Sequence, residues 1–292
     1  MNEVESYILK RINGILHVQD SRIVKRLEGG MSNYTYVVAC GDDKYTYRVP
    51  GKFAERFVDR AEELNNIREV EKLGLNNETV YVEVETGEKL ARYVEGTIMS
   101  DTDIVQYNEM SVAALKKIHS SDLKFKDYNA FGRLDTYEGY CRETGFVMPE
   151  RYLDLRSRLD EAHKAFKNVK RVPCHCDYQP TNLVISGDRF YVLDWEFAGM
   201  NDPFYDIACY GNAGFDKALS LLKEYVGHEP TKDELSRLYF HRAFQCLQWY
   251  AVATFKDKIG LSKDLNLDFS QIAEMFLGMA EELADKILVG SP

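Results

Sequence analysis

The sequence predicts an α+β fold with two lobes, a small antiparallel β-rich N lobe and a larger, mainly helical C lobe. Two patterns support this prediction: β-rich, alternating runs dominate the first third of the chain, and apolar residues at helical spacing dominate the remainder. A chain of 292 residues is also long enough for two lobes, and its hydrophobic fraction of 45% provides a sizeable core. We place the lobes at residues 1–95 and 96–292.

The N lobe begins with three strand-like segments. Residues 21–27 and 34–40 are rich in β-forming side chains, and a glycine-containing segment at residues 28–33 separates them. Residues 44–49 alternate again after a short turn. We therefore expect an antiparallel meander.

A helix and two further strands complete the N lobe. A stripe of apolar residues predicts a helix over residues 54–73, with Gly74 as its stop. Strands are expected at residues 79–85 and 90–94. The second strand ends at Glu95 and Gly96, where we place a hinge between the lobes.

Helices dominate the C lobe. Apolar spacing predicts them over residues 102–119, 153–166 and 235–255. Between them, residues 183–185 and 190–193 form two short strand-like runs joined by a glycine-containing turn, which is typical of a hairpin. The C lobe is thus expected to be a helical body with one inset hairpin.

Composition excludes several classes of protein. A net charge of −10 argues against DNA or RNA as a partner. No apolar run is long enough for a membrane span, and residues 1–20 lack the apolar segment of a secretion signal. The six cysteines are scattered, and the pair Cys174 and Cys176 has no second ligand pair at zinc-site spacing. We therefore expect a cytoplasmic protein with reduced thiols, no membrane insertion and no evident protein partner.

Both ends of the predicted hairpin carry residues suited to phosphoryl transfer. Residues 175–182 have the pattern HxDxxxxN, which is the spacing of a kinase catalytic loop, and Asp194 follows the hairpin where kinases have a metal-binding Asp. Asp177 would orient and deprotonate the attacking hydroxyl, whereas Asn182 and Asp194 would offer oxygen ligands to Mg²⁺. For His175 we expect a structural role as a hydrogen-bonded core residue.

The N lobe supplies candidates for nucleotide binding. Its glycine-containing turn would let backbone N–H groups approach phosphates. The residues concerned are Gly29, Gly30, Ser32 and Asn33. Arg48 stands on a strand where kinases keep a phosphate-pairing lysine, and the following helix offers Glu63, or its neighbour Glu62, as the ion-pair partner.

With these residues assembled, the chain resembles the choline/ethanolamine kinase family, within the larger group of aminoglycoside-phosphotransferase-like enzymes of protein-kinase-like fold. The resemblance is closest over residues 174–182 and 193–208. Residues 29–33 look like the family's phosphate loop, and Arg48 matches the family's arginine in place of the usual kinase lysine. Overall size and the short N lobe resemble bacterial choline kinases.

The resemblance implies a role for each of these segments. Residues 1–95 would bind ATP, and residues 96–292 would carry catalysis and substrate binding. Asp177 would be the base, Asn182 and Asp194 would hold Mg²⁺, and Asp206 would brace the catalytic loop by accepting backbone hydrogen bonds.

The acceptor is predicted from aromatic residues. A quaternary ammonium has no N–H to donate, so proteins bind it with aromatic faces and carboxylates, and this chain has 19 Tyr, 15 Phe and 2 Trp. Trp249 falls where the family has its cation-box tryptophan, although a core role is an open alternative, and Glu196 and Phe197 are similarly placed to face the substrate. Ala213 and Val252 stand where some members carry an acidic residue and a second tryptophan.

The leading interpretation is an ATP- and Mg²⁺-dependent kinase that phosphorylates the hydroxyl of choline. Ethanolamine, thiamine or an aminoglycoside is the alternative acceptor. A non-catalytic kinase-like module that binds a nucleotide or a partner is an alternative of another class, against which the intact Asp177, Asn182 and Asp194 argue. Protein kinase activity lacks support, because Trp195 and Glu196 follow Asp194 in place of Phe and Gly.

Overall fold

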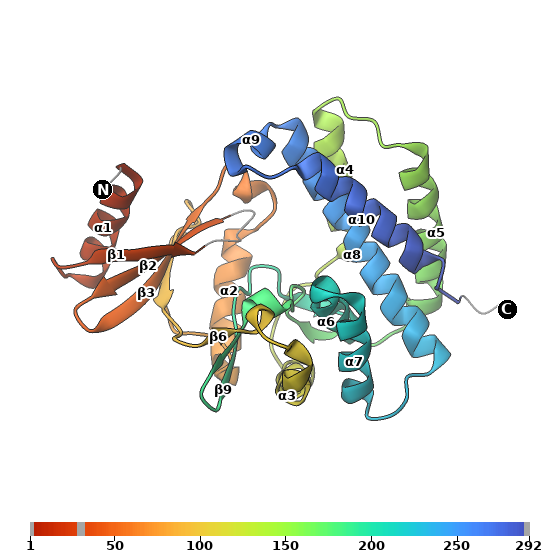
Figure 1. Ribbon diagram of the computed structural model, residues 1–292, viewed down its shortest axis with the longest axis horizontal. Coiled ribbons are helices and arrows are strands. Elements are labelled where there is room, and N and C mark those ends of the chain that lie inside the picture. The colour runs from red at the N-terminus through yellow and green to blue at the C-terminus, as the bar shows by residue number, and fades with distance from the viewer. Residues whose placement is uncertain (1–2, 28–32, 289–292) are drawn as a thin grey trace. The chain divides into compact units, whose positions relative to one another are not determined.

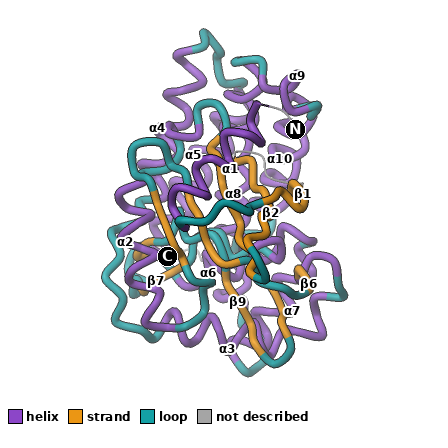
Figure 2. The backbone as a smooth tube through the Cα atoms, turned by 90° about the vertical axis from the view of Figure 1, so that its left-hand side faces the viewer, coloured by secondary structure: helices purple, strands orange, loops and turns teal. Residues whose placement is uncertain are grey.

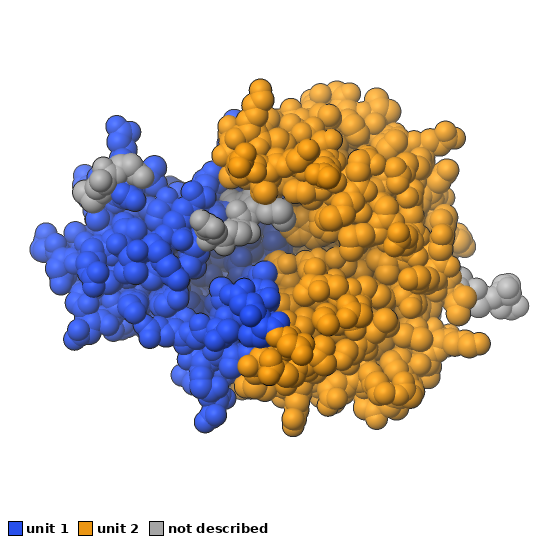
Figure 3. Space-filling model, in the orientation of Figure 1, with its two compact units in different colours: residues 1–102, 123–126, 181–198 blue, residues 103–122, 127–180, 199–292 orange. Residues whose placement is uncertain are grey.

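The structure, a computed structural model, describes residues 3–27 and 33–288 and contains two compact units, which Figure 3 colours separately. Unit 1 consists of Met1–Thr102, Leu123–Lys126 and Thr181–Ala198, and unit 2 of Asp103–Asp122, Asp127–Pro180 and Gly199–Pro292. The predicted division at residue 95 into a nucleotide-binding and a catalytic lobe stays a prediction, because compactness does not show where a nucleotide binds.

A five-stranded antiparallel sheet forms the centre of unit 1. Its strands, in spatial order, are β1 (Arg22–Leu27), β2 (Asn33–Cys40), β3 (Asp43–Pro50), β5 (Lys89–Arg92) and β4 (Thr79–Val82). Tyrosine, valine and threonine recur along β2 and β3, which favours extended backbone, and the end of β2 is buried. The predicted meander and the two later strands are confirmed.

Helix α1 (Glu3–Leu16) packs on this sheet and has no counterpart in the sequence prediction. Ile8 and Ile12 are fully buried against sheet residues that include Tyr36, Tyr47 and Leu90, and Figures 1 and 2 show the helix alongside β1 and β2. Only these two side chains of α1 are buried. Ile8, Ile12 and Leu16 nevertheless recur every four residues, so the helical pattern was present in this segment and the sequence prediction missed it.

Helix α2 (Arg60–Val70) begins later than predicted. Residues 54–56 form a separate 3₁₀ turn, η1 (Ala54–Arg56), and Asp59 then caps α2 by accepting from the N–H groups of Ala61 and Glu62 at 3.0 and 3.1 Å. The predicted start at residue 54 is therefore wrong. The predicted stop is confirmed, because η2 (Glu71–Leu73) ends at Gly74 with φ +61°.

The predicted hairpin is present and belongs to unit 1. Strands β8 (Leu183–Ser186) and β9 (Arg189–Val192) form it, and β6 (Thr97–Ile98) pairs with β8 just before the 3₁₀ turn η3 (Met99–Asp101). Gly96 lies so close to β8 that an added Cβ would be 2.3 Å from the carbonyl oxygen of Ile185. This close approach explains the glycine, and the compact unit continues beyond it to Thr102.

Unit 2 is mainly helical. Its helices are α3 (Asn108–His119), α4 (Ala130–Glu143), α5 (Glu150–Phe166), α6 (Pro203–Tyr210), α7 (Phe215–Val226), α8 (Lys232–Lys258), α9 (Leu261–Leu265) and α10 (Phe269–Ala284), with 3₁₀ turns η4 (Ile104–Tyr107), η5 (Pro180–Asn182, which enters unit 1) and η6 (Gly211–Ala213). A short sheet pairs β7 (Val172–Cys174) with β10 (Gly199–Asn201). Helix α10 packs along α8 (Figure 1), so α8 is buried on nearly all sides.

Two of the three helices predicted here are confirmed, as α5 and α8. The third begins at Asn108 as α3, after the 3₁₀ turn η4, and not at residue 102. Helices α4, α6, α7, α9 and α10 were not predicted. For α6 the reason is physical, because all but its first residue are buried and such a helix has no polar face to reveal its period.

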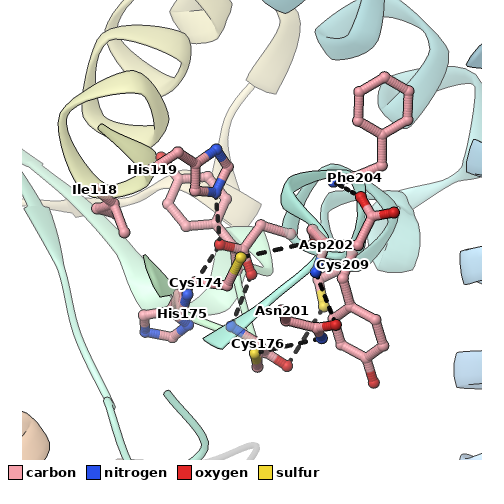
Figure 4. A network of polar contacts seen from close by, with 12 residues as sticks. Ile118, His119, Cys174, His175, Cys176, Asn201, Asp202, Phe204 and Cys209 are labelled. Atoms are coloured by element: carbon pink, nitrogen blue, oxygen red, sulfur yellow. Dashed lines mark hydrogen bonds and ion pairs between the residues drawn. The ribbon is translucent and has the colours of Figure 1, made fainter. Parts of the chain in front are cut away.

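Asp202 fixes the start of α6. Its carboxylate accepts from the N–H of Phe204 at 2.8 Å, as Figure 4 shows, and is ion-paired with Nε2 of His241 at 2.9 Å and bonded by Nε of Arg237 at 2.7 Å. Burial raises the pKa of Asp202, but the contacts with His241 and Arg237 outweigh burial and hold it well below its usual range.

All six cysteines are buried and none forms a disulfide, as expected for reduced thiols. Within residues 3–27 and 33–288, we find no helix that combines the length and the apolar character needed to cross a bilayer.

Candidate active site

The hairpin of unit 1 brings Asn182 and Asp194 to the same end. Leu183 pairs with Val192 in the ladder, and one step further the N–H of Leu193 donates to the carbonyl oxygen of Asn182 at 2.8 Å. Asp194 is the next residue, and its φ of +67° is a left-handed conformation that turns the chain sharply after the strand. Two residues that are twelve apart in sequence are thereby neighbours across a ladder.

The segment after Asp194 is held against helix α2. The side-chain amide of Asn66 donates to the carbonyl oxygens of Trp195 and Ala198 at 3.3 and 3.0 Å, and the indole N–H of Trp195 donates back to Val192 at 2.8 Å. Asn66 and Trp195 are both fully buried. The position of the Asp194 backbone is therefore fixed by two buried side chains.

Arg48 and Glu63 form a buried ion pair within unit 1. Nη1 and Nη2 of Arg48, on β3, donate to the two carboxylate oxygens of Glu63, on α2, at 2.6 and 2.7 Å. This is the two-pronged geometry that makes Arg–carboxylate pairs strong. Of the two glutamates considered from the sequence, Glu63 makes the pair, whereas Glu62 is ion-paired with Lys126.

The same cluster contains Glu196 and a second arginine. Nη1 of Arg48 is 3.2 Å from Glu196, and Nη1 of Arg60 bridges Glu63 and Glu196 at 2.8 Å each. Asp194 lies at the edge of the cluster, 3.8 Å from Nη1 of Arg48. The predicted contact of Glu196 with the substrate stays a prediction. In the structure, the carboxylate of Glu196 is paired with two arginines, Arg48 and Arg60.

The N–H donors of Arg48 are all directed at protein acceptors. Besides its bonds to Glu63 and Glu196, Nε and Nη2 donate to the carbonyl oxygen of Gly87 at 3.3 and 2.9 Å. A guanidinium has five N–H groups, so a nucleotide phosphate could bond to Arg48 only by replacing one of these acceptors. The predicted phosphate contact of Arg48 stays a prediction.

Opposite pKa shifts mark the two glutamates. Burial raises the pKa of Glu63, but Arg48 outweighs burial and lowers it to about 2. Glu196 is also buried, and burial together with the nearby Asp194 raises its pKa to about 7, against the pull of Arg48. Glu63 is therefore a fixed anion at neutral pH, whereas the charge of Glu196 is poorly stabilised.

The donor set of the cluster suits a hard cation. Carboxylate oxygens of Glu63, Asp194 and Glu196 all lie within 4.8 Å of one another. Since arginines occupy Glu63 and Glu196, Asp194, whose side chain is 37% exposed, is the carboxylate of this group that can turn toward an ion. Mg²⁺ prefers such oxygen ligands, so the residues present fit the predicted metal.

In unit 2, Asp206 holds the backbone of the HxDxxxxN segment. Its carboxylate, fully buried at the centre of α6, accepts from the N–H groups of His175 and Cys176 at 2.9 and 2.7 Å. Nε2 of His119 lies 3.1 Å from the same carboxylate, and Nδ1 of His119 is 2.9 Å from the hydroxyl of Tyr225. Figure 4 shows His119 of α3 close to the segment that contains His175 and Cys176.

This bracing supports an unusual backbone conformation. Cys176 has φ +61°, which costs energy for a residue with a side chain and is retained where surrounding bonds enforce it. His175, fully buried, accepts from the N–H of Asp177 at 3.2 Å through Nδ1. The hydrogen bonds expected of His175 and Asp206 are thus present, and Asp177 follows directly on the braced segment.

Trp249 differs from its neighbours on α8. Gln248 and Tyr250 are buried, whereas Trp249 is half-buried and stacks on Phe276 of α10, with ring centroids 6.1 Å apart and planes at 20°. A tryptophan with one face packed and some surface open is suited to contact a ligand as well as to support the helix pair. Phe197, after Glu196 in unit 1, is also half-buried.

Comparison with known proteins decides the family. A family model described as "Phosphotransferase enzyme family" matches residues 23–241, which is most of the chain and includes the site residues described in this subsection other than Trp249 and Phe276. The chain belongs to the phosphotransferase enzyme family. It is therefore a phosphotransferase.

Several relatives are close enough to compare. Protein LicA of Haemophilus influenzae is 28% identical over 256 residues, covering 80% of this chain and 73% of LicA. The choline kinase LicA of Streptococcus pneumoniae has a similar structure, with a TM-score of 0.81 and 24% identity over 97% of this chain and 99% of that one. A choline/ethanolamine kinase family protein of Mesorhizobium loti has a TM-score of 0.75 and 25% identity, covering 95% and 94%. The predicted protein-kinase-like α+β fold is confirmed.

The predicted phosphate loop of this phosphotransferase falls largely outside the described residues. Gly29, Gly30 and Ser32 lie there, and only Asn33 is described, as the first residue of β2 opposite Pro50. The roles assigned to these four residues stay predictions.

Sequence reasoning missed several polar residues that the structure brings to these sites. Arg60 stands three residues before Glu63 and could have been found by that helical spacing. His119 ends α3 and has no sequence signal that links it to Asp206, because 87 residues separate them. Gln179, whose side chain donates to the Asp177 carboxylate, lies inside the recognised motif at a position that the motif leaves unspecified. Asn212, which donates to Gln179, has no sequence signal that links it to the motif.

Proposed function

We propose that this phosphotransferase is an ATP- and Mg²⁺-dependent kinase that transfers the γ-phosphoryl group to the hydroxyl of choline. The observation that carries the proposal is the hydrogen bond from Leu193 to Asn182, because it sets an amide side chain and the carboxylate of Asp194 at one end of a hairpin. Amide and carboxylate oxygens are ligands for Mg²⁺, and phosphoryl transfer from ATP requires that ion. The named choline kinase among the relatives supports the choice of acceptor.

Each residue has one task in this proposal. Bound Mg²⁺ would neutralise charge on the β- and γ-phosphates. Asp177 accepts the proton of the choline hydroxyl while the hydroxyl oxygen bonds to the γ-phosphorus and the bond to the leaving ADP oxygen breaks. Arg48, held by Glu63, adds positive charge on the nucleotide side, and Asp206 keeps the backbone before Asp177 in place.

The acceptor is proposed from the aromatic residues. Trp249 is partly exposed, and an indole face attracts a quaternary ammonium through its negative quadrupole. Phe197 and Glu196, which closely follow Asp194, are proposed as further substrate contacts. Since Ala213 and Val252 provide neither a further carboxylate nor a second indole, ethanolamine is the second acceptor to test. Buried free cysteines favour the reducing cytoplasm as its location.

A coupled ADP-release assay tests the proposal with choline, ethanolamine, thiamine and kanamycin, each with Mg²⁺ and with EDTA. We expect Mg²⁺-dependent turnover with choline that Asp177→Ala abolishes, and no change for Asp264→Ala, an exposed residue of α9. Faster turnover with another acceptor would reassign the substrate. Nucleotide binding by calorimetry without turnover on any acceptor would instead support a non-catalytic module and refute the kinase.

A further inference from the structure

The carboxylate of Asp177 has a partner within its own loop. Nε2 of Gln179 lies 3.0 Å from Oδ1 and 3.1 Å from Oδ2 of Asp177, so one amide nitrogen faces both oxygens at nearly equal distance. The amide oxygen of Gln179 in turn accepts from Nδ2 of Asn212 at 2.7 Å. Asn212 belongs to the 3₁₀ turn η6, and all three residues lie in unit 2.

Chemistry fixes the direction of these hydrogen bonds. An ionised carboxylate only accepts, so Gln179 must present its NH₂ group to Asp177 and its oxygen to Asn212. Asn212 must then donate its own NH₂ group. With Asp177 ionised, the reversed orientation of the Gln179 amide would place its oxygen against the carboxylate oxygens of Asp177. By donating to the amide oxygen of Gln179, Asn212 stabilises the orientation in which the NH₂ group of Gln179 faces Asp177.

The backbone on either side of Asp177 is anchored independently of this chain of bonds. Asp206 holds the N–H groups of His175 and Cys176, and the hydroxyl of the fully buried Tyr178 donates to the carbonyl oxygen of Ser111 at 3.0 Å. The N–H of Gln179 donates to the carbonyl oxygen of Asp177 at 2.8 Å. The backbone is thus fixed without the side chain of Gln179, which leaves orientation of the Asp177 carboxylate as the task of that side chain.

We propose that Gln179 is a positioning residue that sets the plane of the Asp177 carboxylate, and that Asn212 acts through Gln179. The inference rests on the proposed function, in which Asp177 accepts the proton of the acceptor hydroxyl. A base must present one oxygen to that proton, and small errors in such geometry are costly, about 100-fold for 1 Å. Gln179 limits rotation of the carboxylate by binding both of its oxygens.

The test is a kinetic comparison of the full chain with Gln179→Leu, Asn212→Ala and the double variant. We expect kcat to fall about 10- to 100-fold for Gln179→Leu, while KM for the nucleotide changes less than about twofold. Asn212→Ala should cost about 2- to 5-fold, because its side chain is exposed and water can replace its donor. The double variant should equal Gln179→Leu, since Asn212 has no other route to the base.

Other outcomes overturn the inference. A large rise in KM for the nucleotide with unchanged kcat would make Gln179 a phosphate contact, and multiplied effects in the double variant would show that Asn212 acts on its own. Gln271→Leu, at an exposed position of α10, is the matched control and should behave as wild type. If Gln179→Leu unfolds, Gln179→Met, which keeps the length of the side chain, replaces it.

A measurement without turnover separates this inference from the proposed function. The side-chain amide protons of Gln179, observed by NMR in the nucleotide-free protein, should shift markedly in Asp177→Asn and not in Asp264→Asn. Wild-type enzyme that phosphorylates no acceptor would refute the proposed function and remove the base from the inference. Active wild type with no amide shift and with full activity in Gln179→Leu would refute the inference alone.

Discussion

Replacing Asp206 by Asn should loosen the segment that precedes the proposed base. Oδ1 of Asp206 accepts from Cys176, and Oδ2 accepts from His175 and lies 3.1 Å from Nε2 of His119. An asparagine has one oxygen, so its best orientation keeps that oxygen near His175 and His119 and turns its NH₂ group toward the N–H of Cys176. One charge-assisted bond is lost, and a buried N–H is left facing another donor.

The expected loss of stability follows from these contacts. A hydrogen bond to a charged group contributes about 1.5–3 kcal/mol, and a buried donor without an acceptor adds to the loss, so Asp206→Asn should destabilise the protein by about 2–4 kcal/mol. The reversed amide would lose two bonds and cost more. For a chain of this length, each kcal/mol lowers Tm by about 2 °C, which gives a decrease of about 4–8 °C.

Differential scanning fluorimetry and the ADP-release assay measure both consequences. Because the strained backbone at Cys176 loses its acceptor, kcat should fall by at least about tenfold at temperatures where the variant is folded. Asp264→Asn, on the exposed face of α9, should change stability by less than about 0.5 kcal/mol. An Asp206→Asn protein with the Tm and kcat of this control would refute the bracing role.

Three further predictions concern other contacts. Glu63→Gln leaves two buried arginines with Glu196 as their shared carboxylate in this cluster and should lower both Tm and kcat strongly. Glu62→Gln, which loses only a surface pair, should stay within about 0.5 kcal/mol of wild type, and equal effects of the two variants in fluorimetry would contradict the assigned pair. Trp249→Ala should raise KM for choline at least about tenfold and leave KM for ATP unchanged, and a parallel rise in both would indicate packing alone. Asp202→Asn should lower Tm at pH 7, but the difference in Tm from wild type should shrink below about pH 4. The reason is that a carboxylate whose folded pKa is depressed, here by His241 and Arg237, stabilises the fold only while it is ionised. A difference in Tm that grows on acidification would contradict this pH dependence.

The sequence was most informative where polar residues have fixed spacing. The pattern from His175 to Asn182, followed by a hairpin and Asp194, identified residues that the structure places at braced or left-handed positions. Such spacing can be recognised in a sequence because the proposed phosphoryl transfer restricts which residue type can occupy each of these positions. The strands of the N-terminal sheet were visible for a similar reason, since β-branched and aromatic residues alternate along them.

What the sequence could not predict depends on distant partners. Glu62 and Glu63 are the same residue type at adjacent positions, so the sequence does not distinguish them. Only the orientation of α2, which directs Glu63 toward Arg48, shows which glutamate forms the ion pair. The partnership of His119 with Asp206 joins helices that are far apart along the chain. Helix α6 is buried on nearly all sides, so its sequence has no polar face that would indicate a helix, and only the structure shows it.

The assembly of unit 1 from three separate chain segments has a consequence for how the protein is made. Strand β6 pairs with β8, which is synthesised much later. The carbonyl oxygen of Leu75 likewise accepts a hydrogen bond from the N–H of Val192 in β9. A ribosome that adds about 5–20 residues per second needs several seconds to travel from residue 102 to residue 198. During that interval β6 and the carbonyl oxygen of Leu75 lack these partners, so a truncation after residue 102 should yield an incomplete, aggregation-prone fragment in place of an independent domain.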